Sequence, residues 1–171
     1  MRFLDALRNG TGKLKQSPIQ IDEDRNYVYS PSTGTTCPME ELPDSVFSGG
    51  MMGMAIGVWP EKGIAYAPIS GKITAAMPHA FGITSDNGVE VLIHIGVDTV
   101  EMHGDGFNVF VKQNERVTAG EPLLTFDKNK IKKAGYKDIV ITAILNSSDF
   151  PHLHVVPLGS VNAGEPLFCI G

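Results

Sequence analysis

The sequence of 171 residues has little cysteine, little positive charge and no long hydrophobic run. Its two cysteines, Cys37 and Cys169, lack Cys-x-x-Cys spacing and are too few for a disulfide framework, so we expect two reduced thiols. The net charge of −5 and the lack of a basic stretch argue against nucleic-acid binding. The composition therefore excludes a disulfide-rich secreted protein and predicts no nucleic-acid partner.

Hydrophobic segments are short. The longest run, around residues 51–59, is interrupted by Gly53 and Gly57 and is too short to cross a bilayer. No apolar signal region follows Met1. We therefore expect a cytoplasmic protein.

Glycine and proline are abundant, with 19 and 11 residues, which favours short strands and many turns. Two pairs of segments repeat within the chain: YVYSPSTGTT (27–36) resembles IAYAPISGKIT (64–74), and RVTAGEPLLTF (116–126) resembles SVNAGEPLFCI (160–170). A repeated strand–turn–strand unit predicts an all-β fold, a sandwich built from two related halves. One short helix is expected after Asp127, ending near Gly135.

The N-terminal region differs from the rest in composition. Residues 1–24 are predicted to be a flexible segment, and residues 25–171 a single domain. MRFLDALR can form one or two amphipathic turns, so two interpretations of residues 1–16 remain open. They are a frayed tail, or a helix that makes weak contact with a membrane surface or docks on a partner.

Two histidines flank a turn signal in the centre of the chain. Residues 85–88, SDNG, suit the tip of a β-hairpin, with His79 before them and His94 after them. A loop with an even number of residues places both imidazoles on one face of the hairpin, either directly opposite or diagonal to each other. Only an odd loop would separate them. The hairpin therefore predicts a two-histidine site.

The same alternation predicts the surroundings of this site. Phe81, Ile83 and Leu92 are expected on the histidine face, and Ala80, Gly82, Val91, Ile93 and Ile95 in the core. Apolar side chains around two imidazoles favour a docking surface for a partner. The alternative is a sheet covered on both faces, with the histidines as satisfied core residues.

Paired histidines support more than one chemistry. A neutral imidazole can accept a phosphoryl group, and a second imidazole can donate a hydrogen bond to its oxygens. No phosphate-binding loop is present, so the phosphate would come from another protein. The rival is zinc: His94-x-x-x-Asp98 and His152-x-His154 resemble the ligand motifs of lysostaphin-like zinc endopeptidases. We favour a surface role for His152 and His154, and also for His103.

The segment HIGVDTVEMHGDGF (94–107) resembles the phosphoacceptor signature of the glucose-type IIA components of the bacterial phosphoenolpyruvate-dependent sugar phosphotransferase system. The resemblance extends to DSVFS with the Met-rich stretch after it, to APISGKI, to HAFGITSDNGVEVLIHIG and to the GEPL segments. It covers residues 27–171 and implies an antiparallel β-sandwich.

The resemblance also implies roles. His94 would be phosphorylated on Nε2 by the histidine-containing phosphocarrier protein and would pass the phosphoryl group to a cysteine on the IIB domain of a sugar permease. His79 would stabilise the phosphoryl group, and Asp98 would act electrostatically. Met77 stands where many members of that family carry threonine.

We also expect an apolar docking rim around the histidines, and neither a cofactor nor a bound metal. Partner contacts are expected from Phe47, Met51, Met52, Phe81, Leu92 and Val100. In the resembled family the unphosphorylated form can also bind and inhibit transporters or enzymes. A regulatory binding module is therefore the alternative to a phosphocarrier.

Overall fold

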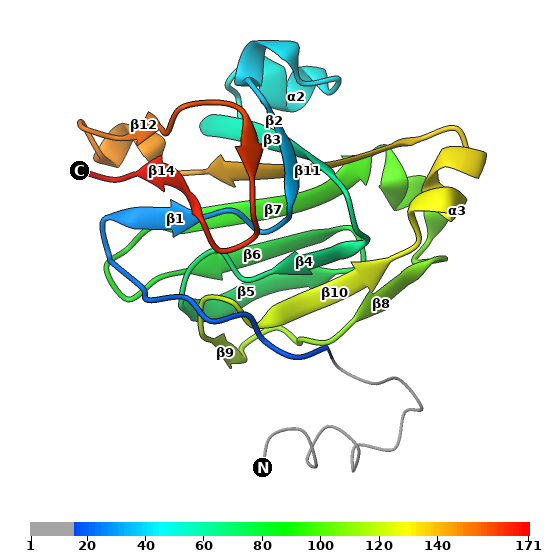
Figure 1. Ribbon diagram of the computed structural model, residues 1–171, viewed down its shortest axis with the longest axis horizontal. Helices are drawn as coiled ribbons and strands as arrows, with labels where there is room; N and C mark the ends of the chain where they lie inside the picture. The colour runs from blue at the N-terminus through cyan, green and yellow to red at the C-terminus, as the bar shows by residue number, and fades with distance from the viewer. Residues whose placement is uncertain (1–15) are drawn as a thin grey trace.

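A large antiparallel sheet forms one layer of the computed structural model, which describes residues 16–171 (Figure 1). It has eight strands, in the order β13-β2-β3-β11-β7-β6-β5-β9. In that order they are β13 (Ser160–Val161), β2 (Gly34–Cys37), β3 (Met54–Pro60), β11 (Lys137–Ile144), β7 (Glu90–Val97), β6 (Ala80–Thr84), β5 (Gly71–Met77) and β9 (Arg116–Val117).

Two small antiparallel sheets form the other layer. One has the order β1-β14-β12, and the other β4-β10-β8. Their strands are β1 (Tyr27–Tyr29), β14 (Pro166–Cys169) and β12 (His154–Val155), and β4 (Ile64–Tyr66), β10 (Pro122–Phe126) and β8 (Phe107–Val109). The predicted all-β antiparallel sandwich is confirmed.

Short helical segments lie at the ends of strands. They are the α-helices α2 (Ser45–Ser48) and α3 (Lys128–Lys133) and the 3₁₀ turns η1 (Met39–Glu41), η2 (Thr99–Met102) and η3 (Ser147–Asp149). The helix predicted after Asp127 is α3: the Asp127 carboxylate accepts a hydrogen bond from the Lys130 N–H at 3.1 Å. The prediction of a single helix missed α2, which is only one turn long.

The main core lies between the two layers. It takes Ile73, Phe81, Ile93 and Ile95 from the large sheet and Leu123, Leu124, Leu167 and Phe168 from the small sheets, among others. Each such side chain contributes about 1.5–3 kcal/mol by leaving water. A second cluster lies on the outer face of the large sheet, where η1 and α2 cover β3 and β11. It consists of Cys37, Leu42, Phe47, Ala55, Ile139, Ile141 and Ala143.

The internal repeats mark the points where the chain crosses between layers. Each repeated segment leaves one layer and enters the other, as from β1 to β2 and from β4 to β5. The first pair binds reciprocally, because the Tyr29 N–H donates to the Pro68 carbonyl and the Tyr66 N–H donates to the Pro31 carbonyl, both at 2.9 Å. The sandwich is therefore made of two related halves, as predicted.

Residues 16–24 run along the turns of the second repeat pair. The Ile19 N–H donates to the Gly120 carbonyl at 3.0 Å, and the Ile19 and Ile21 side chains lie against Gly164. Glu23 accepts two hydrogen bonds from Ser70. Residues 16–24, part of the segment predicted to be flexible, are therefore held by defined contacts.

Residues 1–15, which include most of the segment for which a membrane contact was considered, lie outside the described residues. Within residues 16–171, no helix has the length and hydrophobicity to cross a membrane.

Candidate functional site

The predicted hairpin is present, but its register differs from both predicted alternatives. β6 and β7 pair with Ala80 opposite His94 and Phe81 opposite Ile93. The ladder closes at Ser85, whose N–H donates to the Val89 carbonyl at 2.9 Å. Three residues, 86–88, remain for the loop, and the last of them is Gly88 at φ 85°. A loop that ends in a left-handed glycine is a common three-residue hairpin connection, so the assumption of an even loop was wrong.

The odd loop moves four predicted positions of β6 to the opposite face. Ala80 and Gly82 were expected in the core, but they pair with His94 and Leu92 and so lie on the histidine face of the sheet. Phe81 and Ile83 are 0% and 1% exposed and belong to the main core, so their placement beside the histidines was wrong. Phe81 lies beneath the sheet and is not available to a partner. The core positions Val91, Ile93 and Ile95 and the shared face of Leu92 and His94 are confirmed.

His79 still reaches His94, because it lies in a turn rather than in a strand. Pro78 and His79 connect β5 to β6, where Met77 pairs with Ala80, so strand alternation does not fix the direction of the His79 side chain. The His79 carbonyl accepts a hydrogen bond from the Ile95 N–H at 2.7 Å. The two imidazole centroids are 5.4 Å apart, edge to face at 79°. The predicted pairing of the imidazoles is confirmed.

The hydrogen bond of His94 determines which ring nitrogen is free. Its Nδ1 lies 2.7 Å from the carbonyl oxygen of Gly96. A carbonyl oxygen can only accept, so Nδ1 carries the proton and the Nε2 of the neutral ring keeps a lone pair. The Phe47 ring packs 5.3 Å from the imidazole, centroid to centroid. The site therefore presents Nε2 as the nucleophile.

Burial keeps both imidazoles neutral. It lowers the pKa of His94 from 6.5, while the hydrogen bond to Gly96 and the charges of Asp44 and Asp98 oppose this shift. Burial, and then the proximity of His94, lowers the pKa of His79. The lowered pKa of each ring favours its neutral form at pH 7, the form in which an imidazole nitrogen can act as a nucleophile.

Sequence reasoning missed Asp44 as a member of the site. Its carboxylate caps α2 by accepting the Val46 N–H at 3.0 Å, and its charge acts on His94. An aspartate before Ser-Val-Phe has the form of a helix N-cap, and this was the available signal. Asp98 lies in left-handed backbone at φ 59°, just before η2, and acts on His94 in the same direction.

The apolar side chains predicted to form the docking rim differ in their exposure. Met51 and Val100 are 80% and 52% exposed. Met52 and Leu92 are half-buried against the second cluster, and Phe47 is 3% exposed. Met77, at the family's threonine position, is exposed. Of these side chains, Phe47 packs against the His94 ring, and Met51 and Val100 are free to meet solvent.

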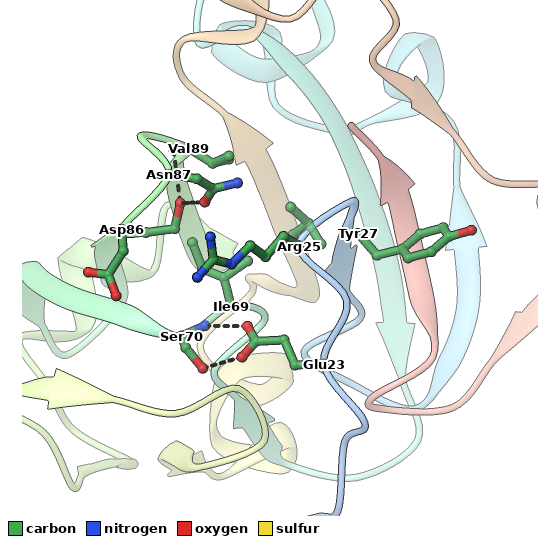
Figure 2. A pocket seen from close by; sticks show the side chains of 10 residues that line it. Glu23, Arg25, Tyr27, Ile69, Ser70, Asp86, Asn87 and Val89 are labelled. Carbon is green, nitrogen blue, oxygen red and sulfur yellow. Dashed lines mark hydrogen bonds between the residues drawn. The ribbon is translucent and has the colours of Figure 1, made fainter. Parts of the chain in front are cut away.

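Two hollows in the surface lie away from the histidines. One, of about 180 Å³, is formed by Glu23, Arg25, Ser70 and the hairpin turn, at the opposite end of the hairpin from His94 (Figure 2). The other, of about 520 Å³, lies between Met39 in η1, β3 and residues 153–158. Neither of these two hollows is lined by His79 or His94.

The remaining histidines and both cysteines are separate from this site. His152 and His154 are exposed near the edge of a small sheet, and His103 is exposed beyond η2. In residues 16–171, His, Cys, Asp and Glu form no group of three that could hold a metal ion. Cys37 and Cys169 are free thiols.

The structure is an all-β sandwich with two adjacent imidazoles on the outer side of its large sheet, where Nε2 of His94 keeps a lone pair. Residues 26–150 match the family model described as phosphoenolpyruvate-dependent sugar phosphotransferase system, EIIA 1. The chain belongs to this family.

Relatives and a solved structure agree. The chain is 37% identical over 157 residues to the PTS system beta-glucoside-specific EIIBCA component of Bacillus subtilis (strain 168), covering 91% of this chain and 26% of that protein. It is 38% identical over 145 residues to the PTS system glucoside-specific EIICBA component of Staphylococcus carnosus (strain TM300), covering 84% and 21%. It therefore spans about a quarter of these relatives or less. The structure of glucose permease IIA from Mycoplasma capricolum matches with a TM-score of 0.76 and 34% identity, over 90% of this chain and 100% of that one.

Proposed function

We propose that this protein is a phosphocarrier that receives a phosphoryl group on Nε2 of His94 and passes it on to another protein. The supporting observation is the hydrogen bond from His94 Nδ1 to Gly96, which leaves Nε2 as the only nucleophilic ring nitrogen. Membership of the phosphotransferase-system EIIA family supplies the reaction class.

The donor we propose is the phosphohistidine of the histidine-containing phosphocarrier protein. The Nε2 lone pair attacks phosphorus, the Nε2–P bond forms, the donor's N–P bond breaks, and its electron pair returns to the donor imidazole. Nδ1 keeps its proton throughout and donates it in a hydrogen bond to the Gly96 carbonyl. Since no strong bond to carbon is made or broken, positioning and charge stabilisation account for most of the catalysis.

The acceptor we propose is a cysteine thiolate on the IIB domain of a sugar permease. The thiolate attacks phosphorus and Nε2 leaves with its electron pair, which restores the neutral ring. The names of the two relatives place A and B components in a single protein, which favours this route. We place both transfers in the cytoplasm, where they support sugar uptake with phosphorylation.

His79 serves as a hydrogen-bond donor to the phosphoryl group. A neutral imidazole keeps one N–H, and the His79 ring meets the His94 ring edge to face at a centroid distance of 5.4 Å. A phosphoryl group on Nε2 would bring anionic oxygens within reach of that N–H. Donation to these oxygens stabilises the charge that moves during transfer.

Both protein partners bind the same apolar rim. We assign it to Met51, Met52, Leu92 and Val100, with Phe47 packed against the His94 ring. Exposed methionine adapts to more than one partner surface because its side chain is flexible and polarizable.

The test is the intact mass of the protein after incubation with phosphoenolpyruvate, enzyme I and the histidine-containing phosphocarrier protein. Wild type and His79→Gln should gain one acid-labile phosphate, and His94→Gln none. Onward transfer to a IIB domain should fail for His79→Gln. His154→Gln, an exposed histidine on the other layer, is the control and should behave as wild type. Phosphate on His94→Gln would overturn the assignment.

A further inference from the structure

The hydrogen bond that orients His94 depends on an irregularity in its own strand. In a regular strand, backbone carbonyls point within the plane of the sheet, whereas side chains stand perpendicular to it. Gly96 departs from this geometry at φ 79°, and its carbonyl turns to meet the His94 ring. The pairing of β7 with β11 shifts at the same point, between Lys137 and Val140.

The side chain of Thr99 makes two contacts with this irregular part of the strand. Thr99 is 1% exposed, and its hydroxyl donates a hydrogen bond to the Ile95 carbonyl, in the peptide that joins Ile95 to Gly96. Its methyl group lies so close to Gly96 that a Cβ at that position would approach it to 2.4 Å. The Thr99 side chain therefore fixes the peptide immediately before the carbonyl that His94 uses.

The backbone of Ile95 connects the two histidines through the peptide groups on its two sides. The Ile95 N–H is held by the His79 carbonyl at 2.7 Å, and the Ile95 carbonyl is held by Thr99. Ile95 is thus held on both sides, between the residue that carries the reactive ring and the residue that orients it.

We propose that Thr99 is a positioning residue for the phosphoryl-transfer site: its hydroxyl holds the backbone at Gly96 so that His94 keeps its proton on Nδ1 and presents Nε2. This inference rests on the proposed function of His94, but its effect exists in the unphosphorylated protein. Thr99 itself is buried and touches neither the phosphoryl group nor a partner.

The test is the tautomer of His94 in Thr99→Val and Thr99→Ser. Valine keeps the methyl groups and loses the hydroxyl, whereas serine keeps the hydroxyl. A third variant, Thr142→Val, is the control: Thr142 is also fully buried, it lies opposite Ile93 on β11, and its hydroxyl has no hydrogen-bond partner in the described part of the chain. The ring-nitrogen correlations of ¹⁵N-labelled, unphosphorylated protein at about pH 8, where both imidazoles are neutral, report the tautomer directly.

We expect Thr99→Val to shift the His94 tautomer ratio toward the Nε2–H form by about three- to tenfold, the range that the loss of one hydrogen bond produces. Thr99→Ser and Thr142→Val should keep the wild-type ratio. A folded Thr99→Val protein with the wild-type ratio would overturn the proposal, as would an equal shift in Thr99→Ser.

Wild-type protein provides a measurement that does not depend on any variant folding. The Thr99 hydroxyl proton should be protected from exchange with solvent, and rapid exchange would contradict its hydrogen bond to Ile95. Failure of the phosphocarrier proposal gives a different result: wild type would take up no phosphate, while the tautomer ratios would still distinguish the variants.

Discussion

Replacing Gly96 by alanine perturbs the candidate site through the backbone alone. Gly96 lies at φ 79°, which is unfavourable for a residue with a Cβ by about 1–2 kcal/mol. The new Cβ would also approach the Thr99 methyl to 2.4 Å and the Lys137 carbonyl oxygen to 2.8 Å. The threonine can shift, but the carbonyl belongs to the neighbouring strand.

Relief of this overlap adds about 1–3 kcal/mol, the usual cost of overpacking. The free energy of unfolding of Gly96→Ala should therefore fall by about 2–5 kcal/mol. Displacement of the Gly96 carbonyl should also weaken its bond to His94 and slow phosphoryl uptake. Urea unfolding measures the first effect, and the rate of phosphorylation at limiting donor measures the second.

Gly135→Ala is the matched control. Gly135 lies at φ 89°, and a Cβ there would meet nothing within 4 Å. It should cost only the backbone part, about 1–2 kcal/mol, and leave phosphorylation unchanged. If Gly96→Ala were no more destabilising than Gly135→Ala and took up phosphate at the wild-type rate, the geometry described around Gly96 would be refuted.

Four further predictions concern the remaining parts of the site. Because folding lowers the pKa of His94, the unfolded state binds the proton more tightly, so the stability of the wild-type protein should fall as the pH drops through 6.5. His94→Gln should lose less stability over the same change in pH, and urea unfolding midpoints above and below pH 6.5 measure the difference. Asp44→Asn should keep the helix cap and lower the pKa of His94 further, because the negative charge of Asp44, which raises that pKa, is lost. An unchanged NMR titration of His94 would contradict this. Met51→Asp should slow transfer without changing stability by more than about 0.5 kcal/mol, whereas Leu158→Asp, at an exposed position outside the rim, should leave transfer unaffected. Phe81→Ala should lower the free energy of unfolding by about 3–5 kcal/mol, as truncation of a core side chain does. A small loss of stability together with weakened partner binding would show that Phe81 contacts the partner instead.

Local patterns in the sequence predicted much of this molecule. Alternation along β7 identified its core side, the Asp127 cap located α3, and the repeats indicated two related halves. Each of these features depends on residues that are close together in the sequence, so a local sequence pattern is enough to predict it.

The parts that could not be predicted depend on backbone conformation at single residues or on distant segments. Loop parity depended on the left-handed conformation of Gly88, which an even loop also accommodates, and one residue of difference moved Phe81 across the sheet. The left-handed bend at Gly96 sets the tautomer of His94, yet glycine is also common where nothing bends. Asp44 reaches the site because a separate segment covers the outer face of the sheet.

The pairing of β1 with β14 has a consequence for how the protein is made. Tyr27 pairs with Cys169, so a strand near the start of the described residues finds its partner only near their end. The small sheet of β1, β14 and β12 cannot form until Cys169 has emerged from the ribosome, and the core residues Val28, Leu167 and Phe168 cannot bury one another before then. The strands that carry His79 and His94 can pair before this step, but the sandwich beneath them cannot close until it has taken place.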